Sequence, residues 1–160
     1  MFGTGLIVFR ETLEAALFVG ILAAATRSVA NRTRWLALGA ALGVLGSLLL
    51  AAAMEQISSW ANGVGQDLVT VAILGFALLM LAWHTIWVSS HAREMTQDAR
   101  RLGSNAAEGA GSLWAVALAV AMTVLREGAE TVLFVAGLVS GGSEGTGSVM
   151  LAALIGLMLG

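Results

Sequence analysis

The fold of this chain is decided by a stretch that occurs twice, as RETLEAALFVGIL at residues 10–22 and as REGAETVLFVAGL at residues 126–138. The two copies align without a gap, and the Arg, both Glu, the Leu-Phe-Val run and the last Leu are the same in both. Each copy places three charges inside an otherwise apolar run. Charges are costly inside a membrane and are kept there mainly where they serve a function. The repeat therefore indicates a membrane protein with a charged interior site.

The composition of the whole chain agrees with this interpretation. Its 160 residues are 58% hydrophobic and 11% charged, whereas a soluble domain is about 45–50% apolar and about 25% charged. So apolar a chain is not disordered, and the absence of Cys excludes disulfides, zinc–thiolate and iron–sulfur sites and thiol nucleophiles. The chain has no basic stripe that would bind nucleic acid, so membrane lipid is the expected surrounding.

The apolar runs predict the helices. About 20 apolar residues in a helix cross the hydrocarbon core of a bilayer, and Trp35–Met54 and Leu68–Val88 are uncharged runs of that length. The two copies lie in further spans, Gly3–Thr26 and about Leu113–Val139, whereas Gly145–Gly160 is too short to cross. We expect an all-α, polytopic membrane helical bundle with four full transmembrane helices and a truncated fifth.

The spacing of the copies predicts their relation. They begin at residues 10 and 126, and because three spans fit between these points, the second copy lies upside down relative to the first. An inverted three-helix repeat is typical of secondary transporters, which bind substrate near the bilayer midplane. We expect residues 1–88 to form the first repeat, 89–112 a cytoplasmic connection with a surface helix and a flexible joint, and 113–160 the start of the second, inverted repeat. The chain is therefore expected to be part of a longer protein.

The connections between the spans predict the orientation. Residues 27–34 carry three Arg and residues 89–112 carry three more, whereas residues 55–67 and 140–147 carry none. The positive-inside rule places the Arg-bearing connections in the cytoplasm. The prediction is a multi-pass protein of the cell membrane with its N-terminus outside.

The charges of each copy predict a cation site. On a helix, Arg10, Glu11 and Glu14 lie within an arc of about 100°, and Arg10 and Glu14 are i, i+4 neighbours. The arginine can neutralise one carboxylate of its helix, while the other stays anionic and faces the bundle interior. If the two spans meet, four Glu and two Arg converge with a formal charge of −2, and carboxylate oxygens suit Ca, Mg, Mn and iron. The predicted metal ligands are Glu11, Glu14, Glu127 and Glu130, with Arg10 and Arg126 as charge partners.

Two further features of the spans have weaker signals. His84 lies seven residues before His91 and beside Trp83, and it could serve as a relay or as a metal ligand on the exit side of the carboxylates. Its aromatic neighbour favours a place in the belt at the membrane interface, and this is the preferred interpretation. Gly39 and Gly43 are spaced to allow close contact with another helix.

The pattern Arg-Glu-x-x-Glu in the first and fourth membrane helices, with the N-terminus outside, resembles the high-affinity iron permease family. That family includes bacterial ferrous-iron and lead permeases and fungal oxidase-coupled permeases, and two inverted three-helix repeats with a seventh helix carry iron inward. The resemblance implies that the motif glutamates are iron ligands and that iron is the transported substrate, with no tightly bound cofactor. It also implies a bacterial inner membrane and an extracytoplasmic oxidase or metal-delivery protein as partner. Thr12 stands where the commonest family motif has Gly.

Alternatives to iron import stay open at this point. Another divalent ion such as lead or manganese could be the substrate, or the charged clusters could be structural pairs of a non-transporting membrane scaffold. An intramembrane enzyme is disfavoured, because the sequence has neither a Ser/His nucleophile arrangement nor a His-Glu-x-x-His zinc motif, although paired glutamates can do acid–base chemistry.

Overall fold

The computed structural model describes residues 2–60, 66–109, 111–140 and 145–160, and it leaves undescribed the side chains of residues 2, 57–60, 66–70, 87–89, 92, 140 and 146. The described residues form helices and turns without a strand, so the all-α prediction is confirmed for them. The helices are α1 (Phe2–Ala25), α2 (Arg32–Trp60), α3 (Gln66–Ala107), α4 (Leu113–Ser140) and α5 (Thr146–Leu159).

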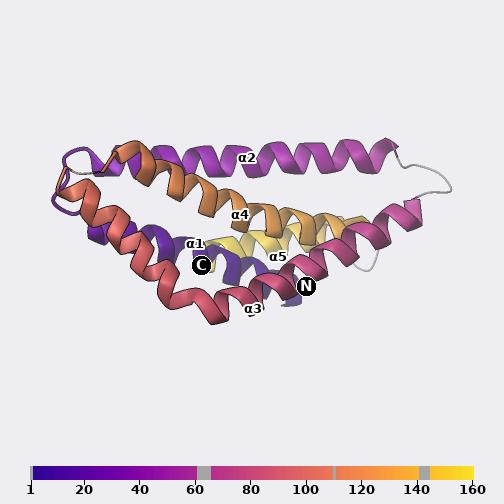
Figure 1. Cartoon of the computed structure of the whole chain (residues 1–160). Helices are drawn as coiled ribbons and strands as arrows, with labels where there is room; N and C mark the ends of the chain where they lie inside the picture. Colours follow the sequence, from indigo (N-terminus) through magenta and orange to yellow (C-terminus); the bar gives the residue numbers. More distant parts are fainter. Residues whose placement is uncertain (1, 61–65, 110, 141–144) are drawn as a thin grey trace.

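Successive helices run in alternating directions along one long bundle (Figure 1). The end of α1, the start of α2, the end of α3 and the start of α4 lie together at one end. At this end, Asn31 and Gly109 have φ angles of 61° and 74°, a left-handed conformation that Asn and Gly adopt with little strain. The two chain reversals at this end are therefore built by residues suited to them.

The helix α3 is longer than the sequence analysis predicts. It continues without a break through the expected connection to Ala107 and bends part-way along its length (Figure 1). The predicted surface helix is thus the second half of α3, and the predicted flexible joint at 103–111 is wrong for its first five residues. Gly103 is helical and buried, and a Cβ there would collide with the Cβ of Ala25 at the end of α1. This glycine allows close packing rather than flexibility.

Length and composition pick out one helix of the described residues as able to cross a membrane, Arg32–Gln56 in α2. The helices α1 and α4 each carry three charges within their apolar runs. Two shorter apolar segments are Val71–Ile86 and Gly147–Leu159. The number of spans therefore remains a prediction.

Small residues let α2 approach α4 closely. A Cβ on Gly39 would lie 2.9 Å from the Cβ of Val120, and one on Gly43 would lie 2.6 Å from the Cβ of Val124 and 2.8 Å from the carbonyl oxygen of Ala121. Real Cβ atoms do not come so near to a backbone or a stiff β-branched side chain. The predicted close helix contact at Gly39 and Gly43 is confirmed.

The same contact occurs a second time, between α5 and α1. A Cβ on Gly156 would meet the Cβ of Val8 at 3.0 Å and the carbonyl oxygen of Gly5. Val8 and Gly5 precede Val124 and Ala121 by the 116 residues that separate the two charged motifs. Two positions at which α4 contacts α2 are therefore the positions at which α1 contacts α5.

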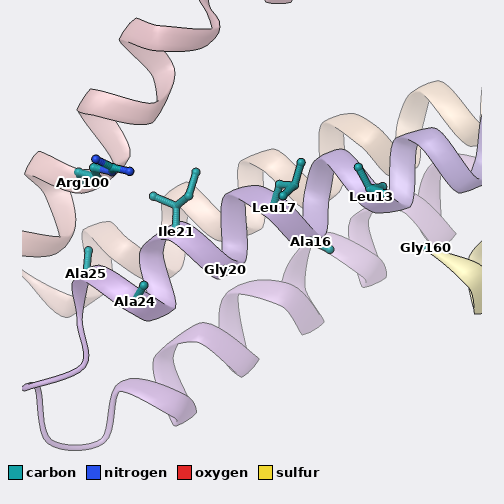
Figure 2. A pocket seen from close by; sticks show the side chains of 9 residues that line it. All are labelled: Leu13, Ala16, Leu17, Gly20, Ile21, Ala24, Ala25, Arg100 and Gly160. Atoms are coloured by element: carbon teal, nitrogen blue, oxygen red, sulfur yellow. The ribbon is translucent and has the colours of Figure 1, made fainter.

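Large apolar side chains cover much of the outside of the bundle. Leu49 and Leu79 are each 73% exposed, and Leu17 is 59% exposed. Figure 2 shows a cavity of about 720 Å³ along one side of α1, where leucine, isoleucine and small residues line the wall and Arg100 of α3 marks one end. Contiguous apolar surface of this kind is unusual on soluble proteins and is expected where lipid or another apolar surface covers it.

Replacing Gly43 with Ala is expected to destabilise the chain by about 1–3 kcal/mol, because the added methyl forces α2 away from α4. Gly20→Ala is the matched control, since a Cβ there has nothing within 4 Å and a helical Gly→Ala change is neutral or favourable. Thermal unfolding in detergent, followed by circular dichroism, measures both variants. An equal response of the two variants would contradict the close contact.

Candidate cation site between two charged helices

Each charged motif pairs its arginine with the second glutamate of the same helix. On α1, Arg10 Nε donates to Glu14 Oε1 at 2.8 Å. On α4, Arg126 Nε lies 3.5 Å from Glu130 Oε1. The predicted i, i+4 pairing is therefore present in both helices, and each pair spans one helical turn.

A histidine from a third helix joins the two motifs. His84 of α3 has its Nε2 at 3.1 Å from Glu14 Oε2 and its Nδ1 at 2.7 Å from Glu130 Oε1. Arg126 Nη2 also contacts Nδ1. Because His84 is only 1% exposed, the preferred interpretation of this residue as part of an interfacial belt is wrong. It lies inside the bundle and touches both charged clusters.

The error has an identifiable cause. His84 stands four residues before the end of the apolar run Leu68–Val88, which suggested a position near the membrane surface. The helix does not end there but continues for 19 residues beyond Val88 to Ala107, so the end of the run does not mark the end of the packed segment. The available signal was that His84 is the single titratable residue within that apolar run.

The first glutamate of each motif is buried. Glu11 is 1% exposed and Glu127 is 7% exposed, and the nearest cation to Glu11 is Arg10, whose Nη1 lies 3.6 Å from Oε1. Among the described residues, five carboxylate oxygens accept no hydrogen bond: both of Glu11, both of Glu130 and Oε2 of Glu127. Two of these oxygens have a basic group nearby, since Oε1 of Glu11 lies 3.6 Å from Arg10 Nη1 and Oε1 of Glu130 lies 2.7 Å from His84 Nδ1. Buried carboxylate oxygens without donors are strongly disfavoured, so this arrangement requires a cation or protons to be stable.

The four predicted ligands come together with His84 in two overlapping groups. Glu11, Glu127 and Glu130 have oxygens within 4.8 Å of one another, and so do the ligand atoms of Glu14, His84 and Glu127. Atoms at these separations can bind one metal ion with modest adjustment. The fold therefore brings together the four glutamates predicted from the sequence, with His84 beside them.

A glycine of the second motif is explained by packing rather than by charge. A Cβ on Gly128 would collide with the side chain of Ser47 on α2. The equivalent residue of the first motif is Thr12, and a Cβ on the facing Gly160 would lie 2.8 Å from the Cβ of Thr12. Gly128 of α4 thus faces Ser47 of α2, and Gly160 at the end of α5 faces Thr12 of α1, so that each contact joins a glycine to a residue with a side chain. The first motif therefore accommodates Thr12 without moving its charged groups.

Two cavities reach the carboxylates. One, of about 390 Å³, is lined by Glu11, Glu127 and Ser47, and the other, of about 290 Å³, is lined by Glu14, Glu127 and Thr96. The larger cavity of Figure 2 has no acidic residue among its described lining residues. The charged cluster is therefore the part of the described structure with the chemistry to hold a cation.

Comparison with known proteins agrees with this chemistry. Residues 1–160 match the iron permease FTR1 family. The chain belongs to this family. It is also 32% identical over 145 residues to the ferrous iron permease EfeU of Escherichia coli O6:H1 strain CFT073. This match covers 84% of the chain and 50% of that protein. The proteins of the same name from Escherichia coli O157:H7 and Shigella sonnei are each 31% identical over 144 residues, with the same coverage.

The family relation sets the broad class of this chain. It is a membrane protein related to iron permeases, and the family consists of transporters rather than enzymes. The chain spans about half the length of the curated relatives it matches. No solved structure gives a significant match.

A double-mutant cycle of Arg126→Gln and Glu130→Gln is expected to give an interaction energy of about 1–3 kcal/mol, because the two groups compensate each other's charge inside the bundle. Unfolding in detergent of the wild type, both single variants and the double variant measures it. The exposed residues Arg101 and Glu108 provide the control cycle, and their effects should add within about 0.5 kcal/mol. Additive effects at Arg126 and Glu130 would argue against the ion pair.

Proposed function

We propose that this chain takes part in carrying iron ions across a membrane through a site formed by Glu11, Glu14, Glu127 and Glu130. The observation that carries the proposal is the convergence of these carboxylates from α1 and α4, with five buried oxygens that accept no hydrogen bond among the described residues. A purely structural cluster would balance its charges, as Arg10 and Glu14 do. Four glutamates against two arginines leave an excess of negative charge in the cluster, and this excess favours a site that binds a cation over a non-transporting scaffold.

An inverted repeat would place such a site between equivalent helices. The proposed first repeat is 1–88, the connection is 89–112, and the second repeat begins at 113. Figure 1 shows α1 and α4 running in opposite directions, as an inverted repeat requires. The matched contacts that Gly43 of α2 makes with α4 and that Gly156 of α5 makes with α1 also support the inverted repeat. A pseudo-twofold axis would relate the pair α2–α4 to the pair α5–α1.

The proposed orientation puts the N-terminus outside and the Arg-bearing turns in the cytoplasm. The ends of α1 and α3 and the starts of α2 and α4 lie together at one end of the bundle (Figure 1), and the exposed Arg27, Arg34, Arg100 and Arg101 belong to these segments. Clustering of arginines at one end supports this orientation. In a multi-pass cell membrane protein of this kind, a metal ion would enter from outside, bind the glutamates and leave when one repeat moves against the other.

Iron is the proposed substrate because the relatives are named ferrous iron permeases. Carboxylate oxygens also suit manganese, and the family that the motif pattern resembles includes lead permeases. Manganese and lead are therefore the competing candidates. Iron would be cargo and not a resident cofactor. An extracytoplasmic oxidase or metal-delivery protein, in a bacterial inner membrane, remains a proposed partner.

Replacing Glu14 or Glu130 with Gln is expected to lower radiolabelled iron uptake at least tenfold in cells that express the protein, because losing even a residue that only orients a metal ligand costs about 10–100-fold in affinity or activity. Immunoblotting of membranes checks that expression persists. Glu55→Gln, at an exposed position of α2, is the control and should transport normally. Unchanged uptake in both site variants would rule out these carboxylates as ligands.

Competition separates iron from the other ions. With iron as the cargo, an excess of unlabelled iron should suppress labelled uptake by the wild-type protein far more than equal concentrations of manganese or lead. Stronger suppression by manganese or lead would identify that ion as the substrate instead.

Single cysteines test the orientation, since the chain has no Cys of its own. A cysteine at Ser104 is expected to be protected from a membrane-impermeant maleimide in intact cells and to react after permeabilisation. A cysteine at Gly145 is expected to react in intact cells, because it lies at the opposite end of α4 from the arginines. The reverse pattern would place the N-terminus in the cytoplasm.

A further inference from the structure

Glu127 belongs to both groups of candidate ligands. It completes one group with Glu11 and Glu130 and another with Glu14 and His84, and in each group the ligand atoms lie within 4.8 Å of one another. Its Oε2 is buried and has no hydrogen-bond donor among the described residues. One carboxylate is thus available to either of two adjoining positions.

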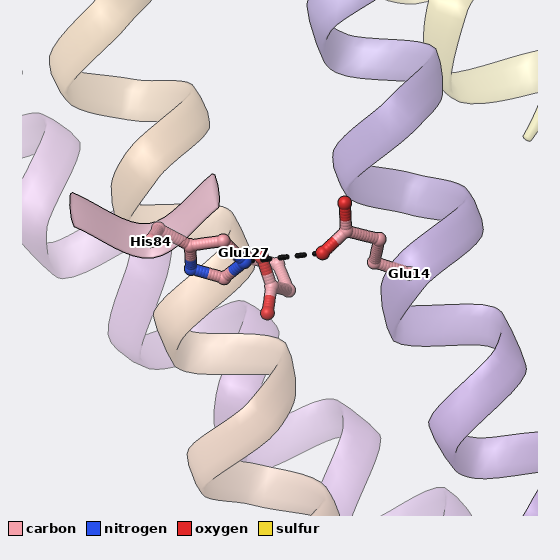
Figure 3. Close-up of side chains that lie close together, drawn as sticks. All are labelled: Glu14, His84 and Glu127. Atoms are coloured by element: carbon pink, nitrogen blue, oxygen red, sulfur yellow. Dashed lines mark hydrogen bonds and ion pairs between the residues drawn. The ribbon is translucent and has the colours of Figure 1, made fainter. Parts of the chain in front are cut away.

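The two positions differ in chemistry. The first offers carboxylate oxygens alone, whereas the second adds an imidazole nitrogen. Figure 3 shows the His84 ring from α3 pointing toward Glu14 of α1, with the Glu127 carboxylate beside it. Ligands from three helices therefore meet at the second position.

The geometry at His84 suits a metal ligand. Its Nε2 lies 3.1 Å from Glu14 Oε2, which is close to the separation of about 3 Å between neighbouring ligands that each bind an ion at about 2.1 Å in octahedral geometry. Its Nδ1 lies 2.7 Å from Glu130 Oε1. Arg126 Nη2 also contacts Nδ1. With a metal ion on Nε2, the ring proton is on Nδ1 and is donated to Glu130, since metal-binding histidines donate their other ring N–H to a carboxylate.

The cavities lie on either side of the shared carboxylate. One is lined by Glu11 and Glu127, and the other by Glu14 and Glu127. The second continues along Ile21 and Met95, on the parts of α1 and α3 that lead to the Arg-bearing end (Figure 1). In the proposed orientation, that is the cytoplasmic side.

From this arrangement we infer that Glu127 passes the ion between two successive positions, an outer one made of carboxylates only and an inner one in which His84 is a nitrogen ligand that selects transition-metal ions. The inference rests on the proposed function. Imidazole suits Fe²⁺, whereas sites made of carboxylate oxygen alone suit Ca²⁺, Mg²⁺ and Mn²⁺. The inner position would therefore discriminate between ions that the outer position accepts together.

X-ray absorption of Fe²⁺ bound anaerobically to the purified chain, without a His tag, tests the nitrogen ligand. The chain has two histidines, His84 and His91, so His91→Gln leaves His84 as the single source of imidazole scattering. That scattering is expected in the wild type and in His91→Gln and is expected to vanish in His84→Gln. Fe²⁺ bound with oxygen ligands only in His91→Gln would overturn the inference, and this result does not depend on the folding of the His84 variant.

Metal affinities separate a ligand role from a structural one. His84→Gln is expected to weaken Fe²⁺ binding by about tenfold while changing Mn²⁺ binding much less, so that the ratio of the two affinities falls. Equal losses for both ions would show that His84 only positions the glutamates and would overturn its role in selectivity. A wild-type chain that binds neither ion would instead refute the proposed function.

Discussion

The structure depends on the cost of placing four carboxylates close together inside the bundle, three of them buried and Glu14 partly buried. Two of them, Glu14 and Glu130, are offset by arginines one helical turn away in their own helices. The other two, Glu11 and Glu127, are buried, and Glu11 shares Arg10 with Glu14. A bundle can hold such groups only if its helices enclose them and a cation or protons offset their charge. Close packing of the helices and the proposed affinity for metal therefore follow from the same constraint.

Helix packing meets this constraint with small residues. Gly39 and Gly43 bring α2 against α4, and Gly156 brings α5 against α1 in the same manner. Inside a membrane, helices gain little from the hydrophobic effect and depend on close backbone approach. The glycines therefore close the bundle around α1 and α4 without adding polar groups, and Gly128 lets this contact run through the charged motif itself.

Much of this could be predicted from residue order. Repeating charges within apolar runs predicted the four glutamates, and α4 ends within one residue of the predicted span. His84 and the length of α3 could not be predicted in the same way. Whether a helix ends with its apolar run depends on what the following residues pack against. Ala99 and Gly103 pack inside the bundle, although the two residues that follow Ala99 are arginines.

The sequence by itself determined which side chains carry charge, how they are spaced on each helix and to which family the chain belongs. These properties are local, since a 3.6-residue period is enough to place Arg10 beside Glu14. Only the tertiary structure decided that His84 lies between the motifs and that Glu127 is shared by two ligand groups. His84 meets Glu130 and Glu14 across 46 and 70 positions of the chain, and Glu127 meets Glu14 and Glu11 across 113 and 116. The geometry of these contacts follows from how closely three helices pack.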